Sequence, residues 1–177
     1  AGYGPMLGPL VASARVFRVP DGADANLWKQ LSPLVVRKPV DGRIAVNDSK
    51  KIYKRRKGLQ ALEEGLLPFL SARHEGTPRD LRGLLLQVAR RGKARPDAYL
   101  DDYPWYQGRN IKLPVDTFSG LIDKRGRQLL EKMEESGIEF LGLAAIPVEV
   151  AEFNRGISEY DNKAKVSFKA VGGLLKR

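Results

Sequence analysis

The chain has 177 residues, enough for one sizeable hydrophobic core or for a core with an appended subdomain. It carries 31 Lys and Arg against 21 Asp and Glu, and the net charge of +10 favours polyanionic partners such as nucleic acid, with a generically basic surface as the alternative. Cysteine is absent, which excludes disulfides and thiolate metal sites. His74 is the single histidine, which excludes catalysis by two histidines. No apolar run reaches the ~18 residues that a helical membrane span needs.

The chain opens with a turn that leads into a strand. Residues 1–10 include three glycines and two prolines, too many for a regular element, and glycine lets another backbone approach closely. Small and β-branched residues over 7–19 then predict a strand.

Short apolar stretches follow, separated by turns. A turn at Asp21-Gly22 precedes residues 31–36, which are apolar but contain Pro33 and so predict an edge strand or a loop. A further turn at 41–43 leads into the apolar residues 44–46, and Asn47-Asp48-Ser49 forms a corner at which a helix begins.

Residues 50–67 predict a helix with a strongly basic start. Leucines and Ile52 form its apolar stripe, whereas six cations crowd the first two turns: Lys50, Lys51, Lys54, Arg55, Arg56 and Lys57. Cations at a helix N-terminus oppose the helix dipole, so local stability does not favour this arrangement. Phosphate binding explains it, and a solvated basic face is the alternative.

Residues 68–114 are irregular in pattern. They hold a helix-like stretch at 81–90 and an aromatic cluster at 99–106. Close to Arg109 and Lys112, these aromatic rings suit stacking on bases or riboses. The alternatives are that the cluster anchors a long loop onto the core or binds another protein.

The remainder of the chain alternates helix and strand. A second long helix is predicted over 117–136, and the nearly unbroken apolar run 138–146 predicts a strand buried on both faces. Pro147 suits the first turn of a short helix through Phe153, and Ser158 suits the N-cap of a final helix that ends at Leu175. This order predicts a layered α/β domain.

The glycine turn and the basic corner are both suited to phosphate. We expect Gly2, Tyr3 and Gly4 to lie beside the helix start formed by Ser49, Lys50 and Lys51, so that the two cup a sugar-phosphate strand. Asp48 is expected to fix the corner by accepting backbone hydrogen bonds rather than to bind a metal.

Four stretches resemble type 2 ribonucleases H (ribonucleases HII and HIII), in the order seen in that family: 1–19, 44–67, 137–155 and 156–177. The family opens with Asp-Glu-Ala-Gly-Arg-Gly-Pro-x-x-Gly-Pro, which the chain fits from Ala1 to Pro9. The family's Asp-Ser-Lys-Lys corner stands here as residues 48–51, and Asn162 matches the asparagine of a later helix. The resemblance implies a ribonuclease H-like layered domain, a mixed sheet flanked by helices, over 1–67 and 117–177, with residues 68–116 as an inserted subdomain.

The resemblance also implies an activity, the hydrolysis of RNA in RNA–DNA hybrids with two Mg²⁺ or Mn²⁺ ions. The glycine turn at residues 2–4 would line the minor groove near the scissile ribonucleotide, and Ser49, Lys50 and Lys51 would hold backbone phosphate. By this alignment the metal-binding carboxylates fall just before Ala1 and after Arg177. We therefore expect no catalytic or metal-binding residue within the chain itself.

One residue departs from the family at the predicted site. Tyr3 stands where the family has arginine or lysine, which replaces a cation by a ring and a hydroxyl. This departure favours the alternative function, a non-catalytic nucleic-acid-binding module of the same fold. No secretory leader is visible, so we expect a cytoplasmic protein; the sequence leaves its oligomeric state open.

Overall fold

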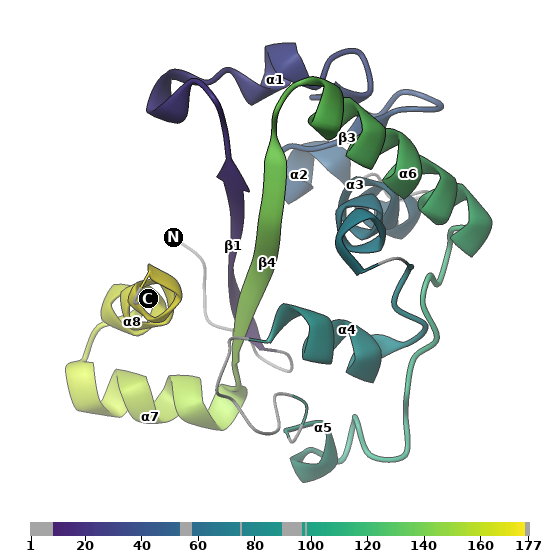
Figure 1. The fold of residues 1–177 in the computed structure, drawn as a ribbon. Coiled ribbons are helices and arrows are strands. Elements are labelled where there is room, and N and C mark those ends of the chain that lie inside the picture. The colour runs from purple at the N-terminus through teal and green to yellow at the C-terminus, as the bar shows by residue number, and fades with distance from the viewer. Residues whose placement is uncertain (1–8, 54–57, 75, 90–96, 98, 176–177) are drawn as a thin grey trace. The chain divides into compact units, whose positions relative to one another are not determined.

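The computed structural model describes residues 9–53, 58–74, 76–89, 97 and 99–175. It is a mixed α/β structure, about half helical, with two small two-stranded sheets in the described part (Figure 1). Contacts divide the chain into two compact units. The terminal unit comprises residues 1–15, 88–109 and 143–177, and the central unit comprises 16–87 and 110–142. The interpretation of residues 68–116 as an insertion stays a prediction, because an insertion is defined by comparison with related proteins and not by contacts within this chain.

The elements follow one another along the chain as β1 (Leu10–Arg18), the 3-10 helix η1 (Gly22–Asp24), α1 (Leu27–Gln30), β2 (Val35–Val36), β3 (Ile44–Ala45), α2 (Ser49–Ile52), α3 (Gly58–His74), α4 (Leu81–Val88), α5 (Tyr99–Asp102), α6 (Ser119–Glu135), β4 (Glu139–Val148), α7 (Val150–Tyr160) and α8 (Lys163–Leu175).

Both sheets are small. β1 pairs with β4, and β2 pairs with β3 in parallel, with Val35 opposite Ile44 and Val36 opposite Ala45. The strand predicted over 7–19 is confirmed as β1. β4 is only half-buried over most of its length, so the prediction of a strand buried on both faces is wrong. Pro147 lies inside β4 and not in a helix. In a two-stranded sheet, β4 has an edge on which, among the described residues, only an isolated bridge from Ala145 to Ala89 forms, and such an edge tolerates the missing N–H.

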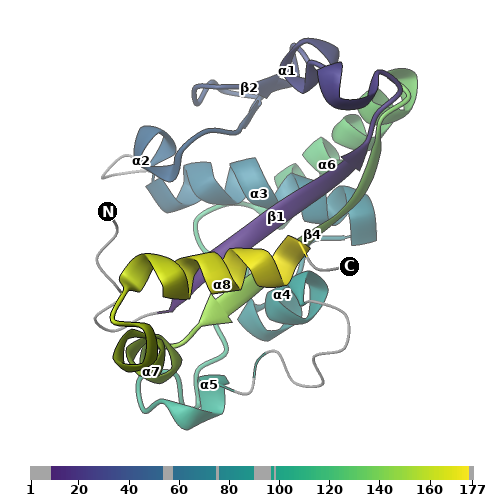
Figure 2. The same ribbon diagram turned by 90° about the vertical axis from the view of Figure 1, so that its left-hand side faces the viewer.

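The core of the central unit lies where α3 and α6 pack against each other (Figures 1 and 2). Phe17, Phe69 and Phe140 form a cluster of rings with centroids 5.1–6.3 Å apart. The most deeply buried side chains of this unit are apolar and come from β3, α3 and α6: Ile44, Leu67, Leu70, Ile122, Leu129 and Met133. The long helix predicted over 117–136 is therefore confirmed, with Ile122, Leu129 and Met133 buried. Leu130 was also expected to point inward, but it is exposed.

The helix predicted over 50–67 begins where it was expected, at Ser49, but it is neither continuous nor finished at residue 67. The helical backbone stops at Tyr53, which is extended (φ −68°, ψ 113°), so α2 and α3 are separate helices. α3 then continues through Pro68 to His74. The proline removes one helical hydrogen bond, but burial of its neighbours Leu67, Phe69 and Leu70 outweighs that loss.

Gly65 lies where α3 comes very close to β3. A Cβ atom placed on it would lie 2.3 Å from the backbone oxygen of Ala45, a distance that backbone atoms cannot accept. The glycine is thus what lets the helix lie directly on the strand.

We expect Gly65→Ala to lower the free energy of unfolding by about 1–3 kcal/mol, because the helix must move off β3. Urea unfolding followed by far-ultraviolet circular dichroism measures it. Gly172→Ala in α8 is the control, since open space surrounds that position and alanine favours helix. Equal effects of the two substitutions would contradict the role of Gly65.

In the terminal unit, α7 and α8 pack together over Val148, Phe153, Val166 and Ala170. The predicted N-cap at Ser158 is wrong, because this residue lies inside α7, where its hydroxyl donates to the Asn154 carbonyl. α7 ends at Tyr160, and the next residue, Asp161, has a left-handed backbone. Asn162 then caps α8, and its Oδ1 accepts from the backbone N–H groups of residues 164 and 165 at 2.9 and 3.2 Å.

Candidate functional site

The basic corner of the central unit is held by a chain of hydrogen bonds. Asn47 Nδ2 donates to the carbonyl of Arg37 at 2.9 Å, which ties the corner to the end of β2. Asn47 Oδ1 accepts from the Asp48 N–H, and Asp48 Oδ1 accepts from the Lys50 N–H, both at 2.8 Å. The carboxylate of Asp48 thus caps α2, and the prediction that it fixes the corner is confirmed.

Four exposed cations surround this corner, and we call them the basic face: Arg37, Lys38, Lys50 and Lys51. None of them forms a salt bridge with another residue that the structure describes. Because the bond from Asn47 joins the two segments that carry them, the four charges belong to one local surface. Their potential adds up there and favours an extended anion.

Two aromatic side chains accompany the basic face. The guanidinium of Arg37 lies 4.8 Å from the centroid of the Trp28 ring. Tyr53, directly after α2, is 55% exposed, and its ring packs so close to Gly58 that a Cβ atom there would lie 2.4 Å from it. Sequence reasoning missed both residues. The signal in the sequence was an aromatic residue next to cations, a pattern typical of surfaces that bind a nucleic-acid strand.

The structure brings together half of the predicted site. Ser49, Lys50 and Lys51 form one helical turn with exposed side chains. Gly2, Tyr3 and Gly4 lie outside the described residues, as do residues 54–57. The proximity of the glycine turn to the lysine helix therefore stays a prediction.

No group of three or more His, Asp or Glu side chains suited to a metal ion occurs among the described residues. His74 is exposed at the end of α3, and its pKa is lowered by partial burial and then by the charge of Arg73. It is therefore mostly neutral at pH 7.

The aromatic cluster of the terminal unit packs mainly on itself. The rings of Tyr103, Trp105 and Tyr106 lie 4.9–6.3 Å apart, and the hydroxyl of Tyr103 accepts from the backbone N–H of Ala151 at 3.2 Å. These contacts anchor the segment to the start of α7. They favour the anchoring role over base stacking.

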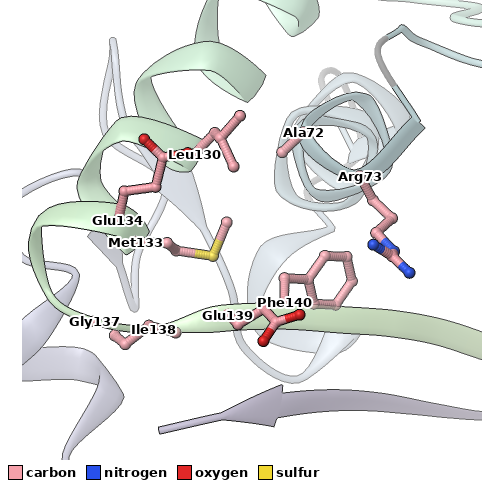
Figure 3. A pocket seen from close by; sticks show the side chains of 9 residues that line it. All are labelled: Ala72, Arg73, Leu130, Met133, Glu134, Gly137, Ile138, Glu139 and Phe140. Atoms are coloured by element: carbon pink, nitrogen blue, oxygen red, sulfur yellow. The ribbon is translucent and has the colours of Figure 1, made fainter. Parts of the chain in front are cut away.

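A hollow of about 310 Å³ in the central unit lies between α3, α6 and the start of β4 (Figure 3). Met133 and Phe140 line it, together with Arg73, Glu134 and Glu139. Glu139 forms a salt bridge with Arg18. The other two charged groups of the hollow are the carboxylate of Glu134 and the guanidinium of Arg73. This pair by itself does not indicate an acid–base catalytic site.

No helix among the described residues is long and apolar enough to cross a membrane. The chain matches no protein-family model, no curated protein and no solved structure.

Proposed function

We propose that this chain binds nucleic acid through the basic face of the central unit. The observation that carries the proposal is the union of Arg37, Lys38, Lys50 and Lys51 on one surface beside Trp28 and Tyr53. Cations in this arrangement contact phosphates without reading sequence, and an exposed ring such as that of Tyr53 stacks on bases or sugars. The excess of ten positive charges strengthens the attraction to any polyanion.

The expected ligand is an RNA–DNA hybrid, and the resemblance to type 2 ribonucleases H supports this choice. In that interpretation the chain is most of a ribonuclease H-like layered domain. The complete cytoplasmic protein hydrolyses the RNA strand with Mg²⁺ or Mn²⁺ held by carboxylates that flank residues 1–177. The glycine turn at Gly2, Tyr3 and Gly4 contacts the ribonucleotide, while Ser49, Lys50 and Lys51 position the strand.

A non-catalytic nucleic-acid-binding module of the same fold is the second candidate, and Tyr3 favours it because the family's turn cation is lost. The residues encoded directly before Ala1 discriminate between the two. Asp-Glu at those positions supports the enzyme, whereas any other pair supports the binding module.

The binding role is tested with Lys50→Ala combined with Lys51→Ala. We expect about tenfold weaker binding of a hybrid and a salt dependence reduced by nearly two phosphate contacts. Fluorescence anisotropy with a labelled hybrid, repeated over a range of salt concentrations, measures both quantities. Lys124→Ala with Lys132→Ala on α6 is the matched control, since it removes the same charge elsewhere in the unit. Equal losses of affinity in the two double variants would show that binding depends on net charge alone, and would contradict a specific role for the basic face.

The catalytic part is tested separately. The full-length gene product is incubated with a uniform hybrid and with a duplex that contains a single ribonucleotide. Cleavage that a chelator abolishes supports the enzyme, whereas tight binding without cleavage supports the module. We expect residues 1–177 alone to cleave neither substrate, and chelator-sensitive cleavage by them would contradict the predicted position of the metal ligands.

A further inference from the structure

A hollow of about 460 Å³ adjoins the basic face within the central unit. The turn between β2 and β3, residues 39–43, forms one side, and α3 and α6 form the other. Ile52, the residue after Lys51 in α2, also lines it. A strand whose phosphates lie on the basic face therefore passes beside a cavity in the size range of small-molecule sites, ~300–1,000 Å³.

The side of the hollow that α3 and α6 form carries one carboxylate, Glu64, and one guanidinium, Arg125, while the β2–β3 turn on the other side adds Asp41 and Arg43. Glu64 Oε2 accepts from Arg125 Nη1 at 2.7 Å, and Glu64 Oε1 accepts from Gln60 Nε2 at 2.8 Å. The Arg125 side chain is only 5% exposed, and its Nε has no hydrogen-bond partner among the described residues. A guanidinium has five donor hydrogens and a carboxylate has several acceptor sites, so both groups keep capacity for a ligand.

Five apolar side chains also line the hollow: Val40, Ala45, Ile52, Ala61 and Leu121. Val40 is 57% exposed, which leaves an apolar side chain on the solvent side of the hollow. Apolar side chains beside a carboxylate–guanidinium pair suit a flat ring that hydrogen-bonds along a single edge. Nucleobases have this form, and proteins that extrude a base hold it between apolar side chains while reading its edge.

We propose that this hollow takes one unstacked guanine of the strand bound on the basic face. The carboxylate of Glu64 accepts from the base's N1–H and N2 amino group, and the guanidinium of Arg125 donates to its O6. Adenine and cytosine present other donor and acceptor patterns at these positions. The inference rests on the proposed nucleic-acid binding, which it extends from phosphate contact to a base preference.

Methyl NMR with guanosine 5′-monophosphate tests the site directly. We expect the methyl signals of Val40, Ile52 and Leu121 to shift, whereas ribose 5-phosphate, which lacks the base, leaves them in place. Ala61→Leu fills the hollow and abolishes the shifts. Ala72→Leu, on the same helix but lining other hollows, preserves them.

The role of Glu64 has its own readout. Inosine 5′-monophosphate lacks the N2 amino group, so we expect it to bind about tenfold more weakly than the guanosine nucleotide. In Glu64→Gln this difference disappears. Equal affinities for the two nucleotides in the unchanged protein would overturn the assignment of guanine.

The failure of the base site and the failure of the proposed function look different. Hybrid binding that depends on Lys50 and Lys51, without nucleotide-induced methyl shifts, overturns the base site alone. Methyl shifts that Ala61→Leu abolishes, without any hybrid binding, support the base site and contradict the nucleic-acid function.

Discussion

Replacing Glu63 with alanine is expected to lower the free energy of unfolding by about 3–6 kcal/mol, from two charge-assisted hydrogen bonds of ~1.5–3 kcal/mol each. Glu63 is 6% exposed in the middle of α3. Its Oε1 accepts from the backbone N–H of Val115 at 2.5 Å, and its Oε2 accepts from that of Asp116 at 3.0 Å. The carboxylate thereby holds the segment before α6 against α3.

Two further variants isolate the cause. Glu63→Gln keeps the size of the side chain but points an amide N–H at one of the two donors, so at least half of the loss should persist. Glu131→Ala removes an exposed carboxylate from α6 and should change stability by less than about 0.5 kcal/mol. Urea unfolding measures all three, and a Glu63→Ala effect no larger than that of Glu131→Ala would show that the clamp contributes nothing.

Asp123→Ala is the second substitution with a large expected effect, about 3 kcal/mol of lost stability. Its Oδ1 accepts three hydrogen bonds: from the hydroxyl of Ser71 at 2.7 Å, the hydroxyl of Thr77 at 2.6 Å and the backbone N–H of Thr77 at 3.0 Å. These bonds join the end of α3 and the following turn to α6. Glu131→Ala again serves as the control, and indistinguishable unfolding curves would contradict the prediction.

The same site predicts a pH dependence. Partial burial by itself raises the pKa of Asp123, but the hydrogen bonds from Thr77 and Ser71 and the nearby charge of Arg127 outweigh it, so the pKa is lowered in the folded protein. Its contribution to stability is therefore complete above the ordinary pKa of an aspartate, ~3.9, and is lost as the pH falls through the folded value. The stability difference between the unchanged protein and Asp123→Asn should be constant from pH 7 to 5 and shrink below pH 4. A difference that grows on acidification would show the opposite shift.

Elements with a strong local pattern were predicted from the sequence. β1 follows from a run of small and β-branched residues, and α4 and α6 follow from helical patterns; each is found within a few residues of its expected ends. The cap of α2 by Asp48 followed from the preference of short polar side chains for helix starts. Each of these depends on neighbours within a few positions in the chain.

Features that depend on distant residues were not predicted. Glu63 and the segment it clamps are more than fifty positions apart, and Ser71 is equally far from Asp123. α3 runs through Pro68 because of burial on its other residues, which a local rule for proline does not include. Similarly, both Ser158 and Asn162 are good N-cap residues, and only the left-handed turn at Asp161 decides between them.

The same distinction applies to the candidate site: its local part was predicted from the sequence, and the part built from distant segments was not. Lys50 and Lys51 stand out because their charges are consecutive in sequence, whereas Arg37 and Lys38 join them only through the bond from Asn47 to β2. The hollow beside them is made of five separate segments, and no spacing along the chain reveals it.

The chain has two tryptophans, and each unit holds one of them. Trp28 lies against the guanidinium of Arg37, and Trp105 sits among the tyrosines near α7. Trp105→Phe therefore leaves an intrinsic fluorophore in the central unit alone, and Trp28→Phe leaves one in the terminal unit alone. With the two variants, the thermal unfolding of each unit can be followed separately by tryptophan fluorescence. A ligand that moves Arg37 away from the Trp28 ring would change that fluorescence without any attached dye.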